Sequence, residues 1–168
     1  MIRRLTPITI RKMRDVLHST KEVELGFPLC INTKNYNINA GEVCKGKECV
    51  IQVSHVCDKD EKFIGKYHTH VDKEGDNIQD LLGYYGWGFG CYGRKPDKIT
   101  CYQRKGSLDH DVFNQMKTAR DRFNMVEDKF VESYASGQIS KERAIKLHDD
   151  VTDTVRKKFY SLFKIDEL

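Results

Sequence analysis

The sequence predicts an α/β (α+β) protein in which a mixed β-sheet is flanked by helices and followed by a C-terminal helical hairpin. Three observations support this prediction. Short apolar segments separated by turn residues fill much of residues 20–104, which is typical of strands. Apolar residues at helical spacing precede them, and apolar residues recur every three or four positions through most of the chain after residue 107.

The first elements follow from these patterns in order. A helix is expected over residues 9–19, where apolar residues recur at near-helical spacing. A strand is expected over residues 22–32, and Gly26 and Pro28 within it indicate an edge position or a bulge. Residues 33–48 are polar and rich in asparagine and glycine, so they favour a loop or a weak hairpin.

The central part of the chain contains further short apolar segments bounded by polar or glycine-containing ones. They predict strands over residues 49–56, 62–67, 87–91 and 98–103, and a short helix over residues 77–82.

The C-terminal part of the chain has a different pattern. One helix carries an apolar stripe that ends near Gly137, and Ser140 is a suitable N-cap for a second helix. Two helices joined by a short turn form an αα-hairpin. We expect it to pack on the sheet and complete the core; presentation of a surface to a partner or to a second copy of the chain is the alternative. The chain is therefore divided into a core, residues 1–106, and a helical extension, residues 107–168.

The overall composition is that of an ordinary globular protein. Charged residues make up 32% of the 168 residues and the net charge is +4. Basic residues are interleaved with acidic ones, so nucleic-acid binding is not required by the charge pattern. No apolar run approaches the roughly 20 residues of a membrane span, and the N-terminus has no apolar signal segment. We expect a cytoplasmic protein that does not associate with membranes.

Six cysteines leave three interpretations open. They could be buried thiols, or disulfides that would indicate an unusual compartment or a hyperthermophile. They could also be ligands of a structural zinc, separate from the candidate catalytic site considered below. The zinc interpretation is the weakest, because no CxxC pair is present. The cysteines are Cys30, Cys44, Cys49, Cys57, Cys91 and Cys101.

The most informative residues are two histidines and an aspartate. His68 and His70 are two positions apart on an extended segment, so their side chains point to the same side. Asp80 follows ten residues after His70 and can complete a three-ligand site. Two imidazoles and a carboxylate suit a catalytic Zn²⁺ that keeps one position open for water. The sequence therefore predicts a metal-dependent hydrolase.

Such a site also needs a group that accepts a proton from water and returns it to the leaving amine. Glu22 and Glu24, at the start of the first predicted strand, are the available candidates, and alternation places both on one face.

These residues together resemble the JAMM (JAB/MPN) metalloprotease motif, in which a glutamate precedes His-x-His and Ser-x-x-Asp. The resemblance covers roughly residues 8–104 and implies an MPN/cytidine-deaminase-like fold for the core. It implies that His68, His70 and Asp80 bind zinc and that Glu24 is the general acid/base. Glu24 is preferred over Glu22 because its distance from the preceding helix better matches the family layout.

Three departures from the family pattern concern the segment after His70. Six residues separate His70 from Asn77, one fewer than usual, and Val71 replaces a common proline. Asn77 replaces the serine that helps to hold the oxyanion, and its amide can donate a similar hydrogen bond. Taken singly, His-x-His and Asn77-x-x-Asp80 are more often structural, since Asn77 is also a good helix N-cap. Their conjunction in the right order favours a metal site.

The resemblance implies a divergent prokaryotic or viral isopeptidase or peptidase. Its substrate would be the C-terminus of a ubiquitin-like or sulfur-carrier protein, whose extended tail would lie along the strand edge near residues 26–29. Two alternatives remain. One is a non-catalytic MPN-type scaffold. The other is a nucleic-acid-binding protein that uses the aromatic residues 84–87 and the basic residues 94–95.

Overall fold

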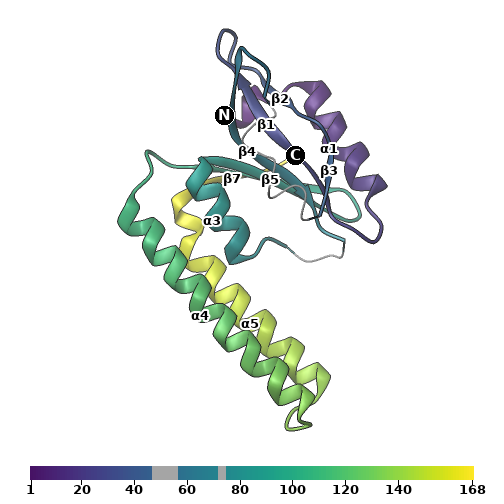
Figure 1. Ribbon diagram of the computed structural model, residues 1–168, viewed down its shortest axis with the longest axis vertical. Coiled ribbons are helices and arrows are strands. Elements are labelled where there is room, and N and C mark those ends of the chain that lie inside the picture. Colours follow the sequence, from purple (N-terminus) through teal and green to yellow (C-terminus); the bar gives the residue numbers. More distant parts are fainter. Residues whose placement is uncertain (47–56, 72–74) are drawn as a thin grey trace.

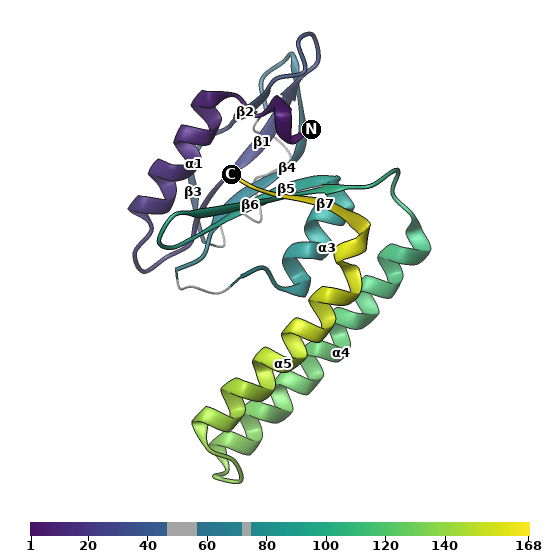
Figure 2. The same cartoon turned by 180° about the vertical axis from the view of Figure 1, so that it is seen from behind.

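The computed structural model describes residues 1–46, 57–71 and 75–168. The described residues form a mixed seven-stranded sheet with helices on both faces (Figures 1 and 2). The strands are β1 (Leu25–Asn32), β2 (Ile38–Ala40), β3 (Cys44–Lys45), β4 (Glu61–Thr69), β5 (Phe89–Arg94), β6 (Lys98–Arg104) and β7 (Phe163–Glu167). The helices are α1 (Pro7–Ser19), α3 (Ile78–Trp87), α4 (His110–Ala135) and α5 (Lys141–Phe159), with 3-10 turns η1 (Ile2–Arg4) and η3 (Tyr160–Leu162).

The strand order is β2-β1-β4-β5-β6-β7, and β3 pairs with β1 beside β2. All pairs are antiparallel except β4 and β5. Parallel neighbours need a crossover, and α3 lies in the connection from β4 to β5. This crossover brings the start of α3 beside the end of β4, where the predicted ligands lie.

Each face of the sheet has its own core. Strand β4 alternates strictly near its end, with Tyr67 and Thr69 fully buried on the α1 side. There the Tyr67 hydroxyl donates to the carbonyl of Met13 at 2.7 Å, and the hydroxyls of Thr69 and Thr20 are 2.7 Å apart. The side chain of His68, which lies between Tyr67 and Thr69 in the strand, consequently points to the opposite face, which α3 covers.

The second core lies between the sheet, α3 and the helical hairpin. It is largely aromatic, and its most buried members include Leu81, Tyr84, Tyr102 and Met116. Helices α4 and α5 run antiparallel and extend well beyond the sheet (Figures 1 and 2). Strand β7 then returns to pair with β6. The proposed boundary between residues 106 and 107 therefore falls between two strands of one sheet.

Several local predictions are corrected by the structure. The helix predicted to end at residue 82 continues to Trp87, where Gly88 caps it with φ 98°. Residues 163–167 lie in a region predicted to be helical but form an edge strand that pairs with β6. The prediction failed because pairing with a distant strand leaves no local signal in the sequence. Pro28 does lie next to a register shift, between Leu29 and Cys30, but β1 is not an edge strand. The strand predicted over residues 49–56 lies outside the described residues.

The described cysteines form disulfides. Cys30 is bonded to Cys57, Cys91 is bonded to Cys101 across the β5–β6 pair, and Cys44 is disulfide-bonded as well. None of the cysteines in the described part of the chain is a free thiol. Of the three interpretations of the cysteines, the structure thus supports the disulfides. In the same residues no helix has both the length and the apolar character needed to cross a bilayer.

Candidate metal centre

Strand β4 and the residue after it present the two histidines. His68 points from β4 toward α3, and His70 follows immediately after the strand end. The His70 N–H donates to the carbonyl of Gly93 at 2.8 Å, which extends the pairing with β5 past the end of β4. The side chains of His68 and His70 are 19% and 7% exposed. His68 is therefore held on a central strand, and His70 directly after it is fixed by its backbone hydrogen bond to β5.

The first turn of α3 presents the carboxylate. Asn77 caps this helix, and its side-chain oxygen accepts a hydrogen bond from the Asp80 N–H at 2.9 Å. The Asp80 carboxylate in turn accepts one from the Asn77 N–H at 3.1 Å. This reciprocal capping box fixes the direction in which the carboxylate points. The same local sequence thus starts the helix and orients a ligand.

The three side chains meet at one point. The Nε2 atoms of His68 and His70 are 2.9 Å apart. The carboxylate oxygens of Asp80 lie 3.3 Å from Nε2 of His68 and 3.5 Å from Nε2 of His70. Ligand atoms at tetrahedral corners around Zn²⁺, with bonds of about 2.0–2.1 Å, are about 3.3 Å apart. The donor types and their spacing therefore fit three corners of a zinc site, and these three residues form the one such group within the described residues.

The electrostatic environment keeps Asp80 ionised. Burial by itself raises the pKa of this carboxyl, but the charge of His68 and the hydrogen bonds from His68 and His70 outweigh it. The pKa of Asp80 is consequently held below its usual range. A carboxylate that is charged at neutral pH is the form that binds a divalent cation.

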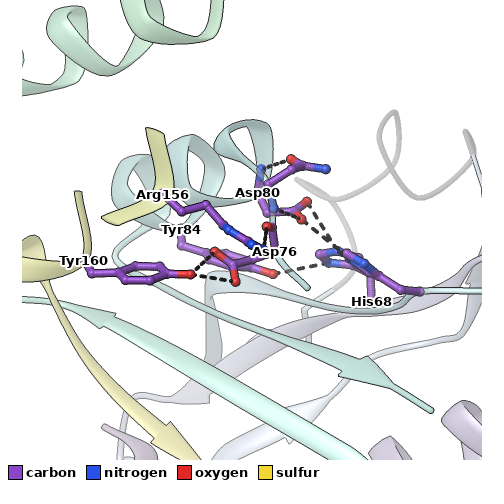
Figure 3. Close-up of polar contacts among 8 residues, drawn as sticks. His68, Asp76, Asp80, Tyr84, Arg156 and Tyr160 are labelled. Atoms are coloured by element: carbon purple, nitrogen blue, oxygen red, sulfur yellow. Dashed lines mark hydrogen bonds and ion pairs between the residues drawn. The ribbon is translucent and has the colours of Figure 1, made fainter. Parts of the chain in front are cut away.

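Tyr84 lies behind His68, one helical turn after Asp80. Its hydroxyl oxygen is 3.5 Å from Nδ1 of His68 (Figure 3). Binding of a metal through Nε2 leaves the proton of imidazole on Nδ1, and a fixed oxygen at that position sets the orientation of the ring. Burial raises the pKa of the Tyr84 hydroxyl well above its ordinary value, so it remains neutral.

Gly90 on β5 makes the space for this tyrosine. A Cβ atom at Gly90 would lie 1.9 Å from Cδ1 and 2.3 Å from Cε1 of Tyr84. The Tyr84 ring is 1% exposed and stacks on Tyr102 with the ring centroids 5.3 Å apart. It therefore has little freedom to move away.

We expect Gly90→Ala to destabilise the protein by about 1–3 kcal/mol, because overpacking forces a buried ring out of its position. Urea-induced unfolding measures the effect. Gly86→Ala is the matched control, since a Cβ there meets Phe113 at an ordinary 3.4 Å in the last turn of α3. It should be neutral or stabilising by up to about 1 kcal/mol. Equal stability of the two variants would contradict this role of Gly90.

The predicted catalytic residues share one pocket with the ligands. A pocket of about 310 Å³ is lined by Glu24 and Asn77 together with His68, His70 and Asp80. Glu24 lies immediately before β1, whose Gly26 pairs with His68. Glu22 is exposed and is not among the residues that line this pocket. The placement favours Glu24 as the acid/base candidate.

Of the other pocket residues, Lys66 was not singled out as a site residue from the sequence, whereas Trp87 belongs to the aromatic residues 84–87 considered there. Lys66 lies two residues before His68 on β4, so the period of two along a strand places both side chains on the face covered by α3. Its ammonium lies 5.1 Å from the ring centroid of Trp87, and burial lowers its pKa. Trp87 is 40% exposed and forms one wall. Trp87 lies two helical turns after Asp80, because α3 extends to residue 87 instead of ending at residue 82.

Comparison of the sequence with protein-family models and with curated proteins gives no match. The resemblance to JAMM metalloproteases therefore rests on the motif residues alone, and the geometry shows that three of them could hold a metal ion.

Proposed function

We propose that this protein is a zinc-dependent hydrolase of the JAMM type, with an MPN-like core, that cleaves a peptide or isopeptide bond. The observation that supports the proposal is the meeting of His68, His70 and Asp80, with ligand atoms 2.9–3.5 Å apart, in a pocket that also contains Glu24 and Asn77. A binding site for a structural ion would have no need of an exposed carboxylate and an amide beside it.

The division of roles is inferred from the resemblance to the JAMM motif and is supported by the shared pocket. A zinc ion bound by the three ligands would supply a Lewis acid that activates water and polarises a carbonyl. Glu24 accepts the proton of the attacking water and delivers it to the departing amine. Its carboxylate makes no hydrogen bond or ion pair to another described residue, which leaves it available for proton transfer.

Asn77 stabilises the charge that develops on the carbonyl oxygen. Its side-chain oxygen is occupied by the N–H of Asp80, so the amide NH₂ is the end left to donate. An amide donor at such a position is a known means of holding an oxyanion. The N-cap role and the catalytic role are compatible, because they use opposite ends of the amide.

The substrate is proposed to be a ubiquitin-like or sulfur-carrier protein with an extended C-terminal tail. A pocket of about 310 Å³ suits a short segment of chain. The expected docking of the tail along β1 is corrected: β3 pairs with Leu25 and Gly26, and β2 pairs from Leu29 to Ile31. We therefore propose that the tail reaches the ligands through the pocket that Trp87 and Lys66 help to line, without adding a strand to β1.

The proposal is preferred over the two alternatives. Nucleic-acid binding through stacked aromatic rings needs exposed rings; Tyr84 and Tyr85 are 1% and 3% exposed, and of the three aromatic rings Trp87 alone, at 40%, is accessible. A non-catalytic scaffold has no use for the full set of three ligands, Glu24 and Asn77 in one pocket. Cytoplasmic location stays a prediction, and the disulfides are more typical of an oxidising compartment or of a hyperthermophile.

Zinc content per chain, measured by elemental analysis, tests the proposal. We expect one zinc in the purified protein and none in a folded His68→Ala/His70→Ala variant, because a single remaining carboxylate does not retain the ion. His18→Ala/His110→Ala, which replaces two exposed histidines, is the matched control and should keep its zinc. Equal zinc in the site variant would place the metal elsewhere. Absence of zinc from every form, even after addition of the ion, would favour the scaffold.

A further inference from the structure

Asp76 is a buried carboxylate outside the proposed catalytic set. It is 2% exposed and immediately precedes the N-cap of α3. Burying a charged group is costly unless it is paired and hydrogen-bonded. Its partners therefore indicate what the fold gains by placing it there.

The partners come from the end of the helical hairpin (Figure 3). The hydroxyl of Tyr160 lies 3.3 and 3.4 Å from the two carboxylate oxygens of Asp76. Arg156 donates to the backbone carbonyl of Asp76 at 2.9 Å and also contacts Asp153. Arg156 and Tyr160 are four residues apart at the end of α5, so they face the same side. Together they hold both the side chain and the backbone of Asp76.

The sheet contributes to the same cluster. Tyr102 on β6 lies beside this cluster, with its ring centroid 6.3 Å from that of Tyr160. Burial raises the pKa of Asp76, and Tyr102 and the charge of Arg156 offset part of that rise. Asp76 is thus held between the hairpin and the sheet by groups more than 20 residues away in sequence.

The position of Asp76 connects the hairpin to the metal centre. The next residue, Asn77, caps α3 and is hydrogen-bonded to Asp80, as described above. Because Asp76 is bonded to Asn77, we expect a displacement of Asp76 to disturb the capping box and the carboxylate that meets His68 and His70. The contacts of Asp76 with Arg156 and Tyr160 tie this end of α3 to the hairpin.

We propose that Asp76 is a positioning residue through which Tyr160 and Arg156 fix the Asp80 ligand, so that the helical hairpin is part of the metal centre. The inference rests on the proposed zinc site. It assigns the hairpin a role in metal affinity, in addition to covering the core.

The test compares variants that preserve charge. Tyr160→Phe removes the hydroxyl donor, and Tyr160→Phe/Arg156→Lys weakens both contacts without changing the net charge. Tyr134→Phe is the matched control, because Tyr134 lies near the far end of α4 and is 48% exposed. Zinc affinity is measured by competition with a chelator. The visible absorption spectrum of the Co²⁺-substituted protein reports coordination geometry.

We expect the double variant to bind zinc about tenfold more weakly and to show an altered Co²⁺ spectrum, as when outer partners of metal ligands are removed. The single variant should lose less affinity, and the control none. Unchanged affinity and spectrum in the double variant, even with a lowered melting temperature, would overturn the inference and leave a purely structural contact. Failure of the unaltered protein to bind zinc would instead refute the proposed function, and the inference with it.

Discussion

Glu24→Gln is expected to abolish turnover while the protein keeps its zinc. Glutamine is nearly isosteric with glutamate but cannot accept the proton of the attacking water. General acid–base catalysis typically contributes about 10²–10⁴-fold to a rate, and Glu24 serves both proton transfers in the proposed reaction. Because Glu24 is exposed and its carboxylate makes no described contact, the change should leave stability within about 0.5 kcal/mol.

The measurement is the hydrolysis of a ubiquitin-like protein that carries a fluorogenic amide at its C-terminus, with zinc content determined on the same samples. Glu22→Gln is the matched control, since Glu22 is also exposed but lies outside the pocket. It should retain full activity. Activity retained by Glu24→Gln and lost by Glu22→Gln would reverse the assignment of the base.

Asn77 variants are expected to separate the cap of α3 from the stabilisation of the oxyanion. Asn77→Asp keeps a side-chain oxygen for the Asp80 N–H but lacks the NH₂ donor. Loss of one oxyanion donor typically costs about 10²–10³ in kcat, so activity should fall by that factor while thermal stability is preserved. Asn77→Ser keeps both an acceptor for the cap and a hydroxyl donor, and it restores the family residue.

Steady-state kinetics and thermal unfolding of the two variants provide the readouts. We expect Asn77→Ser to remain within about tenfold of the unaltered protein, because a hydroxyl donor remains at the same position. Asn77→Ala adds a third point: it loses the donor and also about 1 kcal/mol from the cap. A set of variants whose activities follow only their stabilities would mean that Asn77 is solely a helix cap.

The sequence by itself determined those features that depend on neighbouring residues. The side of β4 on which His68 and His70 lie follows from the period of two along a strand. The start of α3 follows from Asn77 and Asp80, whose capping box needs only a three-residue spacing. The hairpin of α4 and α5 follows from periodic apolar residues and from Ser140 as N-cap. In each case the sequence signal lies within a few neighbouring residues, although packing supplies most of the stabilising energy.

Tertiary structure alone decided the features that depend on distant partners. Pairing with β6 makes residues 163–167 a strand, although the apolar pattern before them is helical. Packing against the sheet keeps α3 helical to Trp87, past the glycines that weaken it locally. The burial of Asp76 against Tyr160, 84 residues away, and the occupied edge of β1 likewise have no local signal. Contacts between residues so far apart leave no period in the sequence, because their energy is realised only when the whole sheet forms.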